Sequence, residues 1–142
     1  GERYVIKFTN RKQEFDCSIL LKEKQSNTKQ PLKDTIYHHS AIIYELGSFT
    51  DSGKIFKYYT IMEYINMDEY LSSLFQNYID TNSEYVEYTE EDKMYSVEEE
   101  DAFILMFRIQ ESIGANDLHA NNIGYGNDGT IKGFDWDRTK EF

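Results

Sequence analysis

DLHANN at residues 117–122 and GFDWD at residues 133–137 are the two stretches on which the fold prediction depends. The residues between them predict a tight hairpin, with 123–126 and 130–134 as its strands and an Asp-Gly pair in its turn that suits positive φ. A hairpin turns the chain back on itself. We therefore expect the two stretches to meet and to face a common pocket.

Three side chains in these stretches are the types that phosphoryl transfer requires. Asp117 and Asn122 lie on one loop, and Asp135 follows the hairpin. One aspartate can orient or deprotonate an attacking hydroxyl, while an asparagine and a second aspartate supply the oxygen ligands that hold Mg²⁺ against nucleotide phosphates. The pattern predicts a phosphate-transfer site. The alternative is a polar turn followed by a surface hairpin with solvated acids.

At these residues the sequence resembles the protein-kinase-like superfamily, most closely its aminoglycoside and choline kinase-type branch. Residues 117–123 match the family pattern D-L-H-x-x-N-I. The resemblance implies that Asp117 is the catalytic base and that Asn122 is a magnesium ligand. It also implies that Asp135 is the metal-binding acid of the segment that reads D-F-G in protein kinases, and that His119 helps to shape the loop.

The same resemblance extends to the first strand, where Lys7 resembles the lysine that holds the nucleotide phosphates. An outward-facing lysine on an alternating strand is the other interpretation. Glu14, on the helix that follows, is the first choice as the partner of Lys7. Asp16 and Glu23 are alternatives, because the side chain that faces the strand depends on the helix orientation.

Residues 61–65 resemble the strand that leads into the hinge of such enzymes. By this resemblance Met62 lines the adenine pocket. The backbone groups of Glu63 to Ile65 would meet the base. ATP and Mg²⁺ are the cofactors that the resemblance implies.

Several positions depart from the family pattern. Ala115 and Asn116 stand where the family has His-Arg or His-Gly, and Asp137 replaces the glycine of D-F-G. After Gly1 the next glycine is Gly47, so no glycine-rich loop precedes the strand that carries the phosphate-binding lysine. Backbone cradling of phosphates would then come from elsewhere.

Local patterns predict the order strand, helix, two strands, two helices and hairpin. Asn10 is the expected cap of the first helix, and Ser96 with Glu99 has capping-box spacing. Tyr70 is expected on the buried side of the helix over 68–78. The expected elements are strand 4–8, helix 11–24, strands 41–49 and 54–65 around a turn at 50–53, helix 68–78, a helix from 96 to 113 and the terminal hairpin.

This order predicts an α+β domain, and the resemblance refines it to a minimal protein-kinase-like fold with a small antiparallel sheet lobe and a short helical lobe. We expect one reduced domain over 1–142. Residues 1–65 would form the sheet lobe and 66–142 a truncated helical lobe with an acidic loop at 84–101.

Composition limits the classes of protein that fit. The 142 residues include 39% hydrophobic and 15% aromatic residues, enough for one folded domain. A single cysteine, Cys17, excludes an internal disulfide framework and a cysteine-rich zinc site, and it fits a reducing, cytoplasmic location. No run approaches the roughly 18 apolar residues that cross a bilayer, so we expect no membrane association.

Negative charge is concentrated in one segment. Residues 84–101 hold nine acids and one base, a net charge of -8 out of -11 for the whole chain. Direct nucleic-acid binding is not expected at this charge. The plain interpretation is a solvated loop and helix start. The more specific one is a surface that docks a basic partner protein or imitates nucleic acid.

Two functional hypotheses follow from these patterns. The first is an enzyme, an ATP- and Mg²⁺-dependent phosphotransferase that acts on a hydroxyl of an unknown acceptor. The second is a catalytically degenerate pseudokinase that serves as a binding or inhibitor module, for example a viral one, through the acidic segment. The first is favoured slightly because Asp117, Asn122 and Asp135 are all present.

Overall fold

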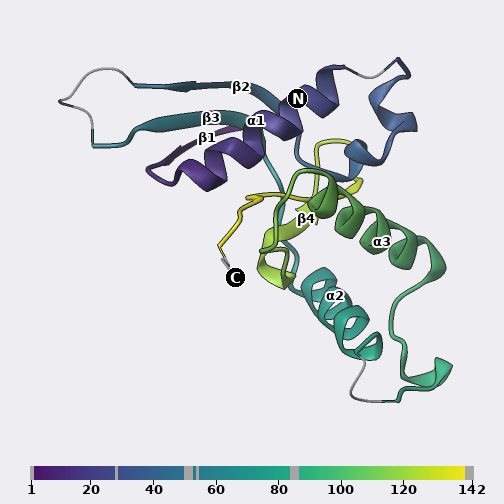
Figure 1. Cartoon of the computed structure of the whole chain (residues 1–142). Coiled ribbons are helices and arrows are strands. Elements are labelled where there is room, and N and C mark those ends of the chain that lie inside the picture. Colours follow the sequence, from purple (N-terminus) through teal and green to yellow (C-terminus); the bar gives the residue numbers. More distant parts are fainter. Residues whose placement is uncertain (1, 28, 50–52, 54, 84–86, 140–142) are drawn as a thin grey trace.

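The computed structural model describes residues 2–139 except 28, 50–52, 54 and 84–86. Within these residues the chain is a mixed α/β protein with two antiparallel sheets, in agreement with the α+β prediction (Figure 1). In chain order the elements are β1 (Tyr4–Thr9), α1 (Lys12–Ser26), the 3-10 turns η1 (Leu32–Asp34) and η2 (Ile36–His39), β2 (Ile43–Ser48), β3 (Tyr58–Glu63), α2 (Glu69–Thr81), η3 (Glu90–Asp92), α3 (Val97–Ser112), η4 (Ala120–Asn122), β4 (Ile123–Tyr125) and β5 (Ile131–Gly133).

The larger sheet has the strand order β1-β3-β2, and both pairs of neighbours are antiparallel. In this register Lys7 of β1 lies opposite Thr60 of β3. Helix α1 connects β1 to β2 and packs against the sheet, where Phe15 stacks on Tyr58 with ring centroids 4.4 Å apart. The turn predicted at 50–53 falls, apart from Gly53, outside the described residues. The sheet thus carries Lys7 beside a helix, as the strand–helix order predicts.

The start of α1 differs from the prediction. The N-cap residue is Arg11, and no side chain caps the helix. Asn10, the expected cap, instead accepts a hydrogen bond from the backbone N–H of Lys57 at 2.8 Å. This bond ties the chain before α1 to the chain before β3. A tertiary contact has therefore replaced the local cap that sequence alone favours.

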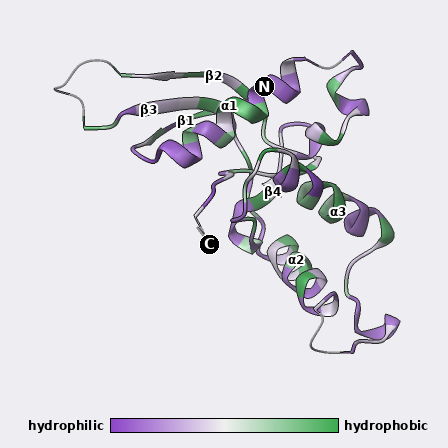
Figure 2. Cartoon of the chain, in the orientation of Figure 1, coloured by the Kyte–Doolittle hydropathy of each residue, from purple (hydrophilic) through white to green (hydrophobic). Residues whose placement is uncertain are grey.

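Helices α2 and α3 contribute part of the hydrophobic core, and apolar and polar residues alternate along both of them (Figure 2). Phe75 of α2 meets Phe103 of α3 edge to face, with centroids 5.1 Å apart. Tyr70, predicted on the buried side, is 64% exposed. At 3.6 residues per turn it lies about a quarter of a turn from the centre of the stripe formed by Leu71 to Tyr78. That displacement is enough to place it in solvent.

Helix α3 begins and ends as predicted. Ser96 Oγ accepts from the backbone N–H of Glu99 at 3.1 Å, and the Glu99 carboxylate accepts from the Ser96 N–H at 2.7 Å. The helix ends at Ser112, and Gly114 follows with a φ of +71°, a conformation that favours glycine. The acidic segment 84–101 is therefore not one loop, because its last five residues belong to this helix.

The hairpin of β4 and β5 is present as predicted, and Gly129 in its turn has a φ of +79°. Backbone bonds join it to the segments that precede β2 and follow β3. Tyr125 and Asn66 exchange two hydrogen bonds of 2.8 and 2.9 Å, and the N–H of Ala41 donates to Gly133 O at 2.9 Å. The hairpin therefore delivers the chain after β5 to the edge of the sheet. Within the described part of the chain no helix has both the length and the apolar character needed to cross a membrane.

Candidate functional site

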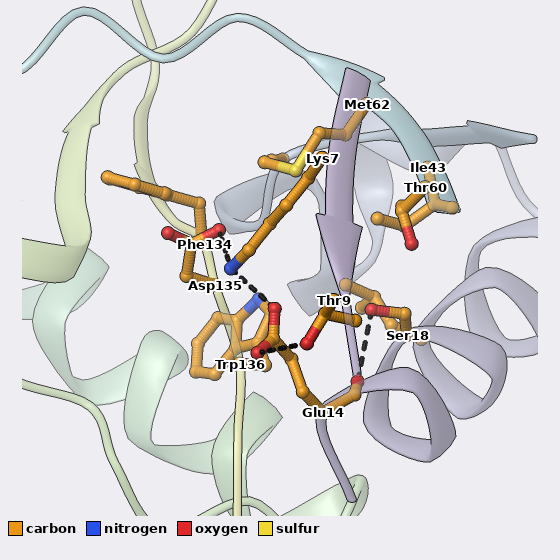
Figure 3. Close-up of a pocket in the computed structure, with 12 residues that line it drawn as sticks. Lys7, Thr9, Glu14, Ser18, Ile43, Thr60, Met62, Phe134, Asp135 and Trp136 are labelled. Carbon is orange, nitrogen blue, oxygen red and sulfur yellow. Dashed lines mark hydrogen bonds and ion pairs between the residues drawn. The ribbon is translucent and has the colours of Figure 1, made fainter. Parts of the chain in front are cut away.

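Lys7 lies at the centre of the candidate site. Its Nζ is 2.5 Å from Glu14 Oε1 and 2.8 Å from Asp135 Oδ1 (Figure 3). The lysine comes from β1, Glu14 from the first turn of α1, and Asp135 from the chain after β5. Of the three acids considered as partners, Glu14 makes the contact, while Asp16 and Glu23 are exposed. The helix orientation decides this, because Glu14 is half-buried on the inner side of α1, where Phe15 and Cys17 are buried.

The two acids hold Lys7 in its charged form. Burial works against the charge, but hydrogen bonds and Coulombic attraction from Asp135 and Glu14 outweigh it, so the pKa of Lys7 lies above its ordinary value. Glu14 is itself fixed, since its Oε2 accepts from the Thr9 hydroxyl at 3.3 Å. The side chain of Lys7 is still 31% exposed. The ammonium group is therefore both positioned and reachable.

Asp135 has an unusual backbone conformation. Its φ is +56°, the one positive value of a non-glycine residue among the described residues. The chain on both sides is fixed, because the N–H of Phe134 donates to Asn122 O at 2.9 Å and the indole N–H of Trp136 donates to Ser40 Oγ at 2.7 Å. Left-handed backbone at a non-glycine residue costs free energy and is concentrated at functional sites.

Trp136 packs closely on Gly133. A Cβ atom at Gly133 would lie 2.6 Å from the indole ring, so only glycine accommodates this contact. Trp136 itself is buried in the core. The contact holds the chain on the C-terminal side of Asp135 against β5.

A cleft opens next to the ion pair of Lys7 and Asp135. It has a volume of about 330 Å³, within the range of small-molecule sites. Apart from the ion pair its walls are largely apolar. A smaller hollow behind the ion pair, against α1, shares Lys7 and Asp135 (Figure 3). The residues that line the cleft are Val5, Ile6, Lys7, Met62, Tyr64, Ile65, Met67, Phe134 and Asp135.

The residues predicted for the hinge divide between two places. Met62 and Ile65 lie in the walls of the cleft. Glu63 does not, because consecutive side chains of β3 point to opposite sides of the sheet, and its carboxylate is buried against Lys132. The backbone N–H of Glu63 donates to Ile42 O, and that of Tyr64 donates to Arg3 O. These two donors are used within the protein.

Asp117 and Asn122 lie on the loop between α3 and β4. The Asn122 side-chain amide donates to the backbone carbonyl of Asp117 at 3.0 Å. The Asp117 carboxylate is partly exposed and lies 4.0 Å from His119 Nε2. His119 Nδ1 accepts from the Asn121 N–H at 3.2 Å, so the histidine shapes the loop locally.

The loop and the chain after β5 are in contact. Asn122 O accepts from Phe134 N, and the N–H of Asn116 donates to Asp137 O at 2.9 Å. These bonds lie on either side of Asp135 in sequence. The segments that carry Asp117 and Asp135 are therefore adjacent, as the hairpin between them predicts. The expected common pocket is not shown, because Asp135 lines the cleft and the smaller hollow but Asp117 and Asn122 line neither.

Neither the protein-family models, nor the curated proteins, nor the solved structures with which the chain was compared gave a match. Function must be inferred from the residues and from the geometry of the cleft. Within the described residues, no three histidine, cysteine or acidic side chains lie close enough to hold a metal ion. A magnesium ion that arrives with a nucleotide requires fewer protein ligands, since phosphates and water complete its shell.

Sequence reasoning missed one pair at this site. The Arg11 guanidinium contacts the Asp137 carboxylate, with Nε 2.8 Å from Oδ2. An acid next to a large apolar residue such as Trp136 is a signal for a buried partner, but the sequence does not identify the partner. Cys17 is buried, and burial together with nearby acids raises its pKa to about 11.

Proposed function

We propose that this protein is an ATP- and Mg²⁺-dependent phosphotransferase of a reduced kinase-like fold that acts on a hydroxyl acceptor. The observation that carries the proposal is Lys7, held between Glu14 and Asp135 at the end of an apolar cleft. In protein kinases a strand lysine paired with a helix glutamate, and an aspartate that holds magnesium, must both be in place for catalysis.

The cleft suits a nucleotide in size and in polarity. Its apolar walls, including Met62 and Ile65, would enclose the adenine, and the ammonium group of Lys7 would contact the phosphates. The sheet of residues 1–65 would be the small lobe, and residues 66–142 a short helical lobe.

The residues present fit a magnesium ion carried by the nucleotide. Lys7 contacts Oδ1 of Asp135, which leaves Oδ2 of the carboxylate for the metal, and the Asn122 amide oxygen is the second protein ligand that we assign. When bound, the ion neutralises charge on the phosphates during transfer. The fixed, left-handed backbone of Asp135 would keep its carboxylate directed at this position.

Asp117 is the residue that we assign to the acceptor hydroxyl. Its carboxylate is partly exposed, and its loop is bonded to the segment that carries Asp135. A positioned base contributes about 10² to 10⁴ in rate. Asp117→Ala should lower ATP turnover by that factor, measured as ADP release, while Mg·ATP still binds. Wild-type turnover in this variant would remove Asp117 from the mechanism.

Calorimetric unfolding with Mg·ATP tests nucleotide binding directly. At a hundredfold excess over its dissociation constant, the nucleotide should stabilise the protein by about 2.7 kcal/mol. Asp135→Asn should lower this effect, whereas Lys93→Ala, at an exposed ion pair on the segment before α3, is the matched control and should retain it. A protein whose unfolding temperature does not change at any Mg·ATP concentration is not the enzyme proposed.

The second candidate function is a binding module that uses the acidic segment. The observation in its favour is that most of the acids between 87 and 101 are exposed to solvent. Glu99 also has a structural role, because it forms the capping box of α3 with Ser96. Reversal of charge at Glu87, Glu91 and Glu98 therefore tests the surface without removing the cap.

A Lys/Arg-rich peptide of defined sequence is a suitable probe for that surface. Its binding is measured by isothermal titration calorimetry at two salt concentrations. The triple Lys variant should bind it more weakly, and salt should weaken binding to the native surface. Binding that survives both changes would exclude the acidic surface as the contact.

A further inference from the structure

The start of α1 is joined directly to the chain that follows Asp135. Arg11 donates from Nε to Asp137 Oδ2 at 2.8 Å and from Nη2 to Oδ1 at 3.3 Å. Nη2 also lies 3.5 Å from Arg138 O. A guanidinium that meets both oxygens of one carboxylate fixes direction as well as distance. The two residues are 126 positions apart in sequence, so this is a tertiary contact between the first helix and the end of the described chain.

The two partners differ in burial. The Asp137 side chain is 10% exposed, and that of Arg11 is 49% exposed. Asp137 is held further by the N–H of Arg138, which donates to Oδ1 at 2.7 Å, and by the N–H of Asn116, which donates to its carbonyl oxygen. A carboxylate this deeply buried requires charged or hydrogen-bonding partners. Asp137 is thus the fixed member of the pair, and Arg11 reaches it from solvent.

The Arg11–Asp137 pair and the ion pairs of Lys7 involve the same two segments, the start of α1 and the chain after β5. Arg11 precedes Glu14 by three residues, about one helical turn, and Asp137 follows Asp135 by two. Thr9 connects the two sites, because its hydroxyl oxygen accepts from the Arg11 N–H at 3.1 Å and its hydroxyl donates to Glu14. The pair therefore links the same two segments that supply the acids on either side of Lys7.

We infer that the Arg11–Asp137 pair is a clasp that positions the nucleotide site, because it holds α1 and the chain after β5 at the separation at which Glu14 and Asp135 both reach Lys7. This inference rests on the proposed function for its consequence on Mg·ATP binding. The clasp also explains why an acid at position 137, where the kinase pattern has glycine, is compatible with the site. Arg11 is a positioning residue here and need not contact the nucleotide.

The test compares Asp137→Asn, Arg11→Ala and Arg11→Lys by two readouts. The first is the affinity for Mg·ATP by titration calorimetry, and the second is the crystal structure of each folded variant, which shows whether Lys7 still contacts both Glu14 and Asp135. We expect Asp137→Asn and Arg11→Ala to weaken Mg·ATP binding about tenfold, because α1 and the chain after β5 are then no longer held where Glu14 and Asp135 both reach Lys7. Arg11→Lys should recover part of the affinity, because an ammonium group keeps the charge and loses the two-oxygen geometry.

Asp137→Asn is the variant expected to stay folded. It leaves no unpaired charge in the interior, because the buried carboxylate becomes a neutral amide and the half-exposed Arg11 can be solvated by water. If the pair only stabilises the fold, the variants unfold at lower temperature, but the folded variants bind Mg·ATP as the wild type does and Lys7 keeps its contacts with both acids. That result would overturn the clasp.

The two readouts separate this inference from the proposed function. If the wild type does not bind Mg·ATP, the phosphotransferase proposal fails, and the clasp is then judged on the contacts of Lys7 in the variant structures. Loss of the Lys7 contact with Glu14 or with Asp135 in folded Asp137→Asn supports the clasp, since it shows that α1 and the chain after β5 have moved apart. Retention of both contacts in the folded variant contradicts it.

Discussion

Two lysine–carboxylate pairs of this protein share their chemistry and differ in their surroundings. Lys132 of β5 and Glu63 of β3 are 2.8 Å apart, and both side chains are 2% exposed. Lys7 is also 2.8 Å from Asp135, but these side chains are about one-third exposed and border a cleft. The same ion pair can therefore serve as an internal connection or as a site that is open to a ligand.

The number and origin of the partners separate the two roles. Glu63 accepts from Lys132, from the Ile42 N–H at 3.2 Å and from the Asn127 N–H at 2.6 Å. With all its partners inside the protein, it joins the hairpin to the sheet and has no access to solvent. Lys7, in contrast, is shared by acids from two different segments. In the function proposed above, Asp135 would turn to the metal ion while Glu14 holds the lysine.

The largest expected effect is the loss of the buried pair. In Lys132→Met the Glu63 carboxylate stays buried without its cation, so the free energy of unfolding should fall by about 3–5 kcal/mol. Urea unfolding followed by circular dichroism measures this. The double variant with Glu63→Gln removes both charges and should recover most of the loss. A decrease below about 1 kcal/mol in Lys132→Met would remove the distinction between the two pairs.

The matching substitution at the Lys7–Asp135 pair should affect nucleotide binding more than stability. Lys7→Met should lower the unfolding free energy by clearly less than Lys132→Met does, because Asp135 is one-third exposed and Glu14, though only 12% exposed, keeps the Thr9 hydroxyl as a partner. It should, however, lose the roughly 2.7 kcal/mol stabilisation by a hundredfold excess of Mg·ATP. Calorimetry with and without nucleotide separates these effects. Equal losses of stability at Lys7 and Lys132 would contradict the comparison.

A smaller effect is expected at high pH. The pKa of Lys7 is raised above its ordinary value of 10.5, so the folded state holds this proton more tightly than the unfolded chain does. The stabilisation is complete below 10.5 and is lost as pH rises through the folded pKa. Tyrosines also titrate in this range, as Tyr44 does with a pKa raised to about 12, chiefly by burial.

The wild type is therefore compared with Lys7→Met, in which the tyrosine contributions are the same and cancel. The difference in unfolding free energy between them, measured in urea at pH 8 and at pH 11.5, should decrease at the higher pH. A difference that stays constant across this range would mean that the ion pairs of Lys7 do not favour its protonated form.

The smallest effect is expected at the surface. Lys93 lies 2.9 Å from Glu90, three residues before it, and Glu90 is largely exposed. Water and salt screen such a pair, so Lys93→Ala should leave the urea midpoint and the response to Mg·ATP unchanged within error. A change that approaches the one at Lys132 would show that exposure does not separate these pairs.

Features that depend on residues close in sequence could be predicted. The capping box of Ser96 and Glu99, the terminal hairpin and the strand that carries Lys7 all follow from local spacing. The choice of Glu14 as the lysine partner also follows, since it lies in the first turn of the helix after that strand.

Features that depend on distant residues could not. Glu63 and Lys132 are 69 positions apart, and no local pattern marks a buried pair. Asn10 has the chemistry of a helix cap, but Lys57, 47 positions away, uses it. Arg11, the partner of Asp137, is likewise distant in sequence, 126 positions away. Each of these contacts is decided by how the hairpin, the sheet and α1 pack together.

Trp136 gives the protein an optical reporter that requires no label. It is the sole tryptophan of the chain, it is buried with its indole N–H bonded to Ser40 Oγ, and it directly follows Asp135. Its intrinsic emission should therefore shift when the chain around Asp135 loses its packing. A single wavelength can then follow both global denaturation and local rearrangement beside Lys7.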